Sequence, residues 1–522
     1  MNATSANDVA VTHAQARFIR GAGSRFFPAF TVSLIVIIGC GRIGFDRNGS
    51  HRDAAAPEGS PTIDVMADIS TDIPNDANDG SVICGNHCGT LQPWLKRFGD
   101  IGPDTGIAID TDSFDNFYLG GTFSGAVDFG GGPLDELPSI EIILAAFDST
   151  GVHRWSNVPT GPSGGGGPWA IHDLATDSTQ GIVITGTPSP GGNNEAFLMT
   201  SYDSNGSYRW GTYNVDSLDL VMFSGAASDA QNRVYMAGYF SGQYDFGCGS
   251  ALSSNGNGLD VFVMSLDATT GACQWANAYG GPDIQLGTDI AVQADGTLFI
   301  TGYFRGSFSA GGAALTSAGS EDIFVASYTR EGVHRWSFAK GSSGVERGQH
   351  IAITSDQRAI VTGIFAQSVD FGTGTLTSVG GDDVFIASFS AADGQLQWAN
   401  QLGGTSNDVA HSIQVSPFGG VHLCGHYFGT VDFGDAQRTS LGDSDAFVVA
   451  YELGTGLPVS SRSYGGIGAD SCRGLAFDST GAMYLTGGFS NAVDFDGTPL
   501  TSAGGTDIFV LKTAPVWSCT CP

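Results

Sequence analysis

The sequence predicts an all-β fold, a seven-bladed β-propeller of four-stranded blades, and three observations lead to it. Trp94, Trp155, Trp210, Trp275, Trp336 and Trp398 mark a unit that recurs every 55–65 residues. Each unit holds short apolar strands joined by turns, and the chain has 78 Gly among its 522 residues. We find no long window with the apolar spacing of three and four that a globular helix needs. A unit of this kind buries its apolar faces against copies of itself.

Residues 1–39 have the pattern of an export signal. Arg17, Arg20 and Arg25 precede an apolar run over 26–38 that is too short to span a bilayer comfortably. The run ends in Ile-Ile-Gly followed by Cys40, which resembles the bacterial lipoprotein box. That resemblance implies cleavage before Cys40, lipidation of Cys40 and attachment of the chain to a membrane. The alternative is an uncleaved anchor; in both cases the body is exported.

Residues 40–82 are expected to form a flexible acidic linker. They are rich in Asp, Pro, Ala, Ser and Gly and almost lack aromatic residues, so they cannot bury enough apolar surface to fold. In lipoproteins of double-membrane bacteria, an Asp after the lipidated Cys retains the protein at the inner membrane. This chain has Gly41 there, which favours the outer membrane or the cell surface.

The body, residues 83–522, repeats the same four short strands. Examples are 351–354 for the first strand, 298–304 for the second, 322–328 for the third and 332–336 for the Trp strand. The third strand has apolar residues on both faces, as expected for a small sheet packed between two neighbouring sheets. A β-solenoid is the alternative, but its repeats are shorter, about 20–30 residues.

Two segments compete to close the ring. The sequence contains seven copies of the first three strands and eight candidates for the fourth. Residues 94–98 can complete the blade built from 471–513, which would join the two ends of the body. The segment around Trp517 is the alternative, and the sequence does not decide between them.

One phrase connects the chain to a known family. Phe-Ser-Gly-Ala-Val-Asp-Phe-Gly over 123–130 recurs in related form over 240–247, 365–372, 428–434 and 489–495. With the repeated Asp-Ile/Val-Phe-Val/Ile-Ala strand, it resembles the bacterial seven-bladed β-propeller repeat proteins of secreted and cell-surface chains. The resemblance covers about residues 92–517. It implies the fold and an exported location, and no common activity.

The formal net charge of −31 limits the partners. So acidic a surface repels nucleic acid and anionic lipid head groups. We therefore expect a protein or glycan partner, a monomeric chain, and membrane contact through the lipid on Cys40 alone. No resident cofactor is predicted.

A carboxylate precedes the third strand of every unit. Its repetition predicts a structural task, acceptance of backbone N–H groups from the preceding turn, with calcium binding between blades as the alternative. The seven residues are Glu141, Glu195, Asp260, Asp322, Asp383, Asp445 and Asp507.

The cysteines predict disulfides, because the body is exported. Cys84 and Cys88 lie just before the first blade, and Cys519 and Cys521 just after the last. Bridges between these pairs would staple the ring, and a zinc site is the alternative. Cys248 and Cys273 share one repeat and are a further candidate pair. Cys424 and Cys472 lie in neighbouring repeats, and their pairing is left open.

A cluster of polar side chains is expected at one mouth of the central channel. Histidines occur just before the first strand of three repeats, and that strand is innermost in a propeller. Histidines with nearby carboxylates are residue types that bind metals, so these side chains could form a small-ligand site. The alternative is that they only bind water at the channel mouth. The candidate residues of this site are His172, Asp173, Asp289, His350, His411 and Arg473.

Three functions are consistent with these features. The first is a binding or interaction scaffold at the cell envelope, whose binding face is the long loop between second and third strands. The second is a channel-centred enzyme, because residues 267–275 resemble the tryptophan-docking motif of quinone-cofactor propellers, which are typically eight-bladed. The third is a passive spacer. No motif for nucleophilic or zinc catalysis is present, so enzyme activity is not the preferred prediction and no catalytic residue is assigned.

Overall fold

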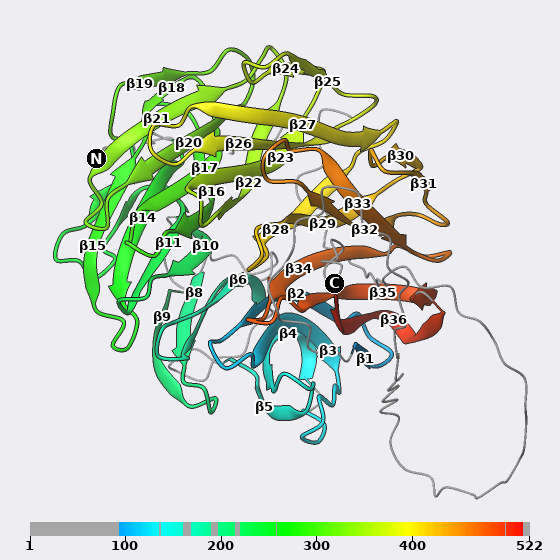
Figure 1. The fold of residues 1–522 in the computed structure, drawn as a ribbon. Helices are drawn as coiled ribbons and strands as arrows, with labels where there is room; N and C mark the ends of the chain where they lie inside the picture. The colour runs from blue at the N-terminus through cyan, green and yellow to red at the C-terminus, as the bar shows by residue number, and fades with distance from the viewer. Residues whose placement is uncertain are drawn as a thin grey trace, which may run out of the picture. The chain divides into compact units, whose positions relative to one another are not determined.

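The structure, a computed structural model, describes residues 93–134, 137–159, 169–188, 197–214, 220–256, 258–495 and 497–514. These residues form strands and turns without a helix, arranged as seven four-stranded antiparallel blades in a ring (Figure 1). The predicted fold class is confirmed. Within the described part of the chain, no helix is long and apolar enough to cross a membrane. The signal over 1–39, Cys40 and the linker over 40–82 lie outside the described residues.

Six blades have their strands in sequence order from the inside of the ring to the outside, and in the seventh the outermost strand is the first of the described body. The first three blades are β2 (Thr105–Thr111), β3 (Phe117–Gly125), β4 (Leu137–Phe147) and β5 (His153–Asn157); β6 (Trp169–Thr176), β7 (Ile182–Pro188), β8 (Phe197–Tyr202) and β9 (Tyr208–Asn214); and β10 (Val221–Ser228), β11 (Arg233–Phe240), β14 (Asp260–Asp267) and β15 (Cys273–Tyr279).

The remaining blades follow the same order. They are β16 (Gln285–Val292), β17 (Leu298–Phe304), β20 (Asp322–Tyr328) and β21 (His334–Lys340); β22 (Glu346–Ile353), β23 (Arg358–Phe365), β26 (Asp383–Ser390) and β27 (Leu396–Gly404); β28 (Val409–Val415), β29 (Val421–Tyr427), β32 (Asp445–Tyr451) and β33 (Pro458–Tyr464); and β34 (Ser471–Phe477), β35 (Met483–Phe495), β36 (Thr498–Thr513) and β1 (Trp94–Phe98).

The seventh blade combines both ends of the described body. Strand β1 pairs antiparallel with β36, from Trp94 opposite Lys512 to Phe98 opposite Ile508, beside the C-terminal strands (Figure 1). Phe98 packs on Phe129 of the first blade, with 4.8 Å between ring centroids. Of the two segments that competed to close the ring, 94–98 is therefore the one that does so.

The blades adhere through apolar side chains and through the repeated Trp. All seven residues of β20 and all seven of β32 are buried, which explains why the third strand lacks apolar–polar alternation. Five of the Trp residues on outer strands donate their Nε1–H to a carbonyl in the turn between the third and fourth strands of the next blade, whereas Trp94 on β1 does not. The acceptors of Trp155, Trp210, Trp275, Trp336 and Trp398 are Ser204, Ala268, Arg330, Ala391 and Leu453, at 2.7–3.2 Å.

The repeated Val-Asp-Phe-Gly phrase folds into a small hairpin between the second and third strands. In the fifth blade this hairpin is β24 (Ser368–Asp370) and β25 (Thr375–Thr377), and Val369 and Phe371 of the phrase are each 1 % exposed. In the sixth blade, β30 (Thr430–Asp432) also pairs with the end of β27 in the preceding blade. The loop predicted as a free binding surface is therefore partly committed to holding blades together.

Candidate functional site

The innermost strand of every blade carries a one-residue β-bulge at the same place. The register of each first strand against its second shifts by one residue there, and a bulge turns the extra side chain to a new direction. The seven bulged residues are Ile107, His172, Ser224, Thr288, Gln349, His411 and Arg473. Seven side chains, one from each blade, therefore extend from the inner wall of the ring.

The six predicted channel residues all belong to this inner wall. His172, His411 and Arg473 are bulged residues, whereas Asp173, Asp289 and His350 come directly after a bulge. The histidines were expected just before the first strand, and that placement was wrong because they lie inside it. The apolar pattern marks only the half of each inner strand that packs against its neighbours, so the strand starts earlier than the pattern indicates.

The carboxylates on the inner wall connect successive blades. Asp173 accepts the backbone N–H of Ala226 at 2.8 Å, and Asp289 accepts that of Ile351 at 2.9 Å, each in the next blade. Burial raises the pKa of Asp173 to about 7, and the nearby carboxylate of Asp110 adds to the effect. Burial and then Asp173 raise the pKa of Asp289. Both groups therefore bind protons more readily than an ordinary Asp.

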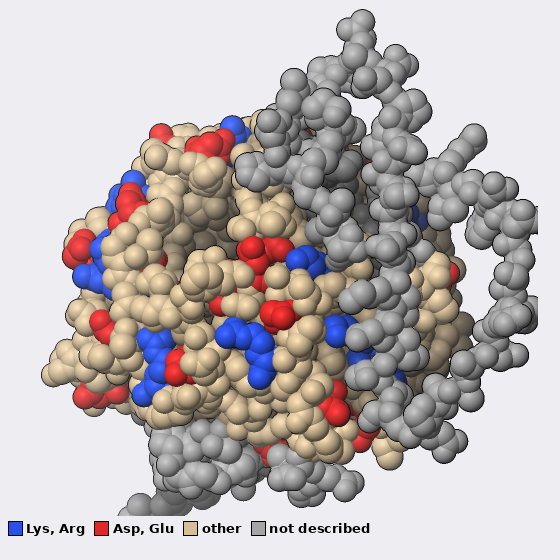
Figure 2. All heavy atoms as spheres, turned by 60° about the horizontal axis from the view of Figure 1, so that its bottom comes forward, with Lys and Arg blue, Asp and Glu red and all other residues tan. Residues whose placement is uncertain are grey.

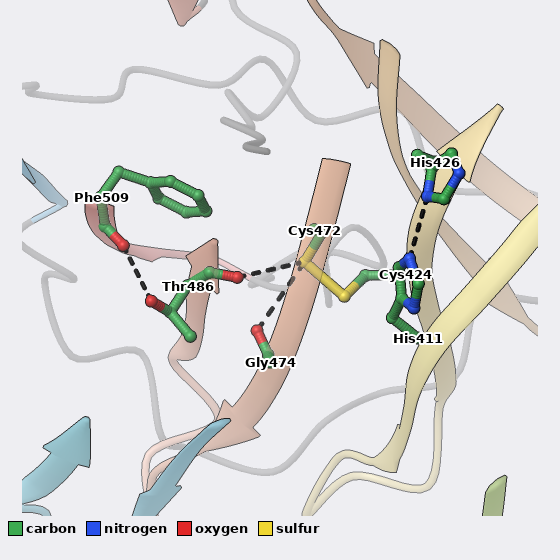
Figure 3. Close-up of a disulfide and its surroundings, with 7 residues drawn as sticks. All are labelled: His411, Cys424, His426, Cys472, Gly474, Thr486 and Phe509. Carbon is green, nitrogen blue, oxygen red and sulfur yellow. Dashed lines mark hydrogen bonds between the residues drawn. A yellow bond between two sulfur atoms is a disulfide. The ribbon is translucent and has the colours of Figure 1, made fainter. Parts of the chain in front are cut away.

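Basic side chains occupy the inner wall of the last three blades. His411 and His426 lie with Nε2 and Nδ1 2.9 Å apart and their rings stacked (Figure 3). Burial, and after it the cation of Arg473, lowers the pKa of His426 to about 3. Burial also lowers the pKa of His350 to about 4. These imidazoles are therefore neutral at pH 7, and one of the stacked pair donates to the other.

The sequence did not single out His426. It lies on β29, the second strand of its blade, and is brought inward because Val409 pairs with it just before the bulge at His411. The sequence did contain a signal for His426, since it follows Cys-Gly at the place where the fourth and fifth blades have Thr-Gly followed by Tyr303 or Ile364.

The inner wall is divided by residue type, with carboxyl groups apart from the imidazoles and the guanidinium, rather than gathered into one metal site. Acidic groups come from the first, second and fourth blades, and basic groups from the fifth to seventh. They meet where His350 Nδ1 lies 3.8 Å from Asp289 Oδ2. His172 is engaged separately, at 2.8 Å from the Thr187 hydroxyl. Across the described ranges, no group of three or more His, Cys, Asp or Glu is arranged to hold a metal ion.

Two disulfides are present among the described residues. Cys248 pairs with Cys273 inside the third blade, and Cys424 pairs with Cys472 across the sixth and seventh (Figure 3). Both Cys424 and Cys472 are fully buried. Cys84, Cys88, Cys519 and Cys521 lie outside the described residues, so their predicted pairing stays a prediction.

The Cys424–Cys472 disulfide occupies a junction that other blades fill with Thr and Gly. A Cβ on Gly348 would lie 2.3 Å from the Thr301 hydroxyl, and one on Gly106 would lie 2.1 Å from the Thr486 hydroxyl. Thr301 and Gly348 hold the same strand positions as Cys424 and Cys472. The disulfide therefore replaces a close contact between blades with a covalent bond.

The carboxylates before the third strands hold the preceding loops. Asp383 accepts the Val379 N–H at 2.9 Å, and Asp445 and Asp507 accept the equivalent N–H groups of Leu441 and Ala503. Asp260 and Asp322 do the same with Asn255 and Ala318. This geometry supports the structural task that repetition predicted. Glu195 lies outside the described residues.

A second set of carboxylates accompanies them and was missed from the sequence. Asp408 starts the inner strand after Asp383, accepting N–H groups from Gly404 at 2.7 Å and Phe428 at 3.1 Å. Burial raises its pKa to about 7, with Asp383 adding to the rise. The sequence pattern that marks this second set is a fixed spacing of 24 or 25 residues after the carboxylate that precedes a third strand. It is shared by Glu346, Asp408 and Asp470.

Four large aliphatic side chains are exposed on one rim of the ring. Ile101, Val379, Leu441 and Ile467 are 83 %, 60 %, 73 % and 79 % exposed. All four lie in connections from second to third strands or from one blade to the next, which meet at the same rim of an antiparallel blade. Gly442, next to Leu441, would place a Cβ 2.6 Å from the Ile467 carbonyl carbon. We call this set the aliphatic arc.

Charged side chains give no comparable patch on the face that is visible in Figure 2. There Lys and Arg are interspersed with Asp and Glu over the described surface. Many of the chain's Asp residues are used in turns: Asp112 and Asp177, for example, accept backbone N–H groups two and four residues ahead. The acidity therefore serves the turns as well as the surface.

Comparisons with known proteins add little beyond the fold. No family model matches the chain. It is 26 % identical over 223 residues to an uncharacterized WD repeat-containing protein of Acanthamoeba polyphaga mimivirus, covering 35 % of this chain and 16 % of that protein. The chain thus spans about a sixth of that relative's length.

Several solved structures are similar at low sequence identity. The quinohemoprotein alcohol dehydrogenase of Comamonas testosteroni has 11 % identity, a TM-score of 0.40 and coverage of 84 % of this chain and 79 % of its own. BamB of Moraxella catarrhalis has 14 % identity and a TM-score of 0.31, and the match covers 71 % of this chain and 88 % of BamB. The β-propeller domain of the Trilobed protease of Pyrococcus furiosus has 6 % identity and a TM-score of 0.43, and the match covers 81 % of this chain and 98 % of that domain.

Proposed function

We propose that this protein is an exported, lipid-anchored β-propeller that acts as a binding scaffold at the cell envelope, with the aliphatic arc as its docking surface. The observation that carries the proposal is the exposure of four large aliphatic side chains on adjacent connections of one rim. Isolated apolar residues are common on any surface, whereas contiguous ones usually mark an interaction site.

The energetics suit a protein partner. Burying an aliphatic side chain fully contributes about 1.5–3 kcal/mol, so the arc offers several kcal/mol before the cost of association is subtracted. The arc rests on connections held by the repeated carboxylates, since Leu441 and Val379 donate their backbone N–H groups to Asp445 and Asp383. A pre-ordered surface loses less entropy on binding than a flexible loop.

The proposed cellular location rests on the N-terminal sequence pattern. The lipoprotein box at Cys40 and the linker over 40–82 support a tether to the outer membrane or the cell surface. Two disulfides among the described residues agree with a compartment outside the cytoplasm. The repeat phrase further supports membership of the bacterial seven-bladed repeat proteins.

Site-specific crosslinking in cells tests the scaffold function. A photo-reactive residue at Leu441 or Ile467 should give one discrete crosslinked protein, and serine substitutions at Ile101 and Val379 should weaken it. The matched control is Val333, which is 61 % exposed but lies in a turn on the opposite rim. Equal crosslinking from Val333, or none from the arc, would leave the passive spacer as the better account.

A channel-centred enzyme is the second candidate, favoured by the shifted titratable groups on the inner wall. Such groups gather at functional sites, although structural networks shift pKa values too. Thermal unfolding with calcium, chelator and pyrroloquinoline quinone in turn tests it. A ligand at 100 times its dissociation constant stabilises the folded state by about 2.7 kcal/mol. A shift that is lost in His411→Phe would favour the channel over the scaffold.

A further inference from the structure

The seam between the fourth and fifth blades departs from the repeat pattern at two neighbouring positions. In three other blades the residue two after the Trp is an Asn that donates its side-chain N–H to a Gly carbonyl of the next blade. These pairs are Asn157 with Gly206, Asn277 with Gly332 and Asn400 with Gly456, at 2.5–3.3 Å. The fourth blade has Phe338 at this position.

The second departure is a charge in place of an apolar side chain. Four residues after the Trp, or after Ser460 that replaces it in the sixth blade, three other outer strands carry Phe98, Leu402 and Tyr464, all at most 5 % exposed. Phe98 covers Phe129 of the next hairpin, and Tyr464 lies 6.2 Å from Phe495 of another. In the fourth blade the residue is Lys340, beside Phe371 and Gly372 of the fifth blade.

These replacements coincide with an open groove of about 490 Å³. One wall is the outer strand β21, with Trp336, Phe338 and Lys340; the other is formed by the hairpin and turn of the fifth blade, with Thr373 and Asp393. The volume lies within the range of about 300–1,000 Å³ typical of small-ligand sites. Repeat symmetry explains a feature present in every blade. The pair of Phe338 and Lys340 occurs at these two positions in no other blade, so repeat symmetry does not account for it.

The walls of the groove combine two kinds of surface. The rings of Trp336 and Phe338 are stacked, at 13° and 5.8 Å between centroids, and both line the groove beside Gly394. Polar groups surround the rings: the Lys340 ammonium, the Asp393 carboxylate and the side chains of Ser337, Thr373 and Gln395. Hydrogen bonds, first from the Ser390 hydroxyl, hold the pKa of Asp393 below its usual value.

We propose that this groove binds a neutral oligosaccharide. A pyranose ring has a C–H face that packs on an aromatic platform and hydroxyl groups at its edge that need both donors and acceptors. Lys340 donates, Asp393 accepts, and Gln395 does both. One charge of each sign lines the groove, and the chain carries a net charge of −31, so an acidic sugar is disfavoured.

This site lies on the outer wall, apart from the aliphatic arc and the inner wall, and goes beyond the proposed docking function. The variant that tests it follows from the repeat itself. Phe338→Asn with Lys340→Leu gives the fourth blade the residues that the fifth has at Asn400 and Leu402. The Asn would have the Gly394 carbonyl as its acceptor, and Leu would cover Phe371, so the groove should close while the fold is kept.

Titration of the full chain with maltotriose, cellotriose and chitotriose, followed by tryptophan fluorescence and calorimetry, is the experiment. We expect saturable binding of at least one neutral trisaccharide, with a dissociation constant below about 1 mM, and a loss of tenfold or more, about 1.4 kcal/mol, in the double variant. Thermal unfolding of the variant verifies that it is folded.

The controls distinguish the groove from the surface in general. Asn277→Ala alters the neighbouring seam and should leave binding unchanged. The proposal is overturned if no neutral trisaccharide binds the native protein, if the folded double variant binds as well as the native protein, or if trigalacturonate binds more tightly than every neutral sugar.

Discussion

The disulfide between Cys424 and Cys472 can be removed with little change in packing, because other blades show what replaces it. Cys424→Thr with Cys472→Gly installs the residue pair that Thr301 and Gly348 form at the corresponding junction. The variant therefore isolates the covalent bond from the contact between blades. Ordinary Cys→Ala variants would also leave a cavity.

The expected loss follows from the loop that the bond closes. The two cysteines are 48 residues apart, and closing a loop of that length destabilises the unfolded chain by about 4 kcal/mol. The new Thr hydroxyl regains part of this by donating to a third-strand carbonyl, as Thr362 does to Phe385 at 2.7 Å, worth about 1 kcal/mol. The net loss should be about 3 kcal/mol, which for the roughly 400 described residues corresponds to about 3–4 °C in Tm.

Thermal unfolding under oxidising conditions measures this loss, with the variant and the native protein side by side. A variant as stable as the native protein would show that the bond contributes nothing to the folded state. A loss of more than about 8 °C would show that the Thr-Gly pair does not fit this junction. The first result would refute the loop-closure contribution, and the second would refute the equivalence between the disulfide and the Thr-Gly contacts.

Three further predictions test other parts of the ring. Phe98→Ala should cost about 3–5 kcal/mol in urea unfolding, because Phe98 is 4 % exposed and holds the closing strand against Phe129; a loss below 1 kcal/mol would mean that β1 is dispensable. The contribution of Asp408 to stability should fall as pH rises from about 4 to 7, because its pKa is raised to about 7 and the folded state holds a proton that the unfolded chain releases; the stability of Asp408→Asn relative to the native protein should therefore rise with pH over this range, and a constant difference would contradict the assignment. Dithiothreitol should reduce Cys248–Cys273 before the buried Cys424–Cys472 under native conditions, as mass spectrometry of alkylated peptides would reveal, and the reverse order would contradict the burial.

The candidate site was predictable in its residue types but not in its arrangement. The sequence placed His172, His350 and His411 near the inner strands, because each unit begins with an innermost strand. It could not show the bulge that every inner strand carries, because a bulge leaves no mark in the apolar pattern. His426 was missed for the same reason, since register decides which second-strand residue reaches the inner wall.

Repetition by itself determined most of the architecture. Each of the seven repeat units has strands too short to be stable alone and therefore requires neighbours on both sides. A closed ring supplies these neighbours for every blade. Repetition also separated residues that perform the same structural task in several units, such as Asp383 and Trp398, from residues that occur in a single unit. Local patterns of this kind are encoded within one unit and can be read without its neighbours.

Only the tertiary structure decided what depends on contacts between units. It selected β1 to close the ring, paired Cys424 with Cys472 across two blades, and left Ile101, Val379, Leu441 and Ile467 exposed on one rim. It also left a groove where Phe338 and Lys340 break the seam. The physical reason is common to all four: burial and distance between residues far apart in the chain are set by how the blades pack, and a linear pattern carries no record of that packing.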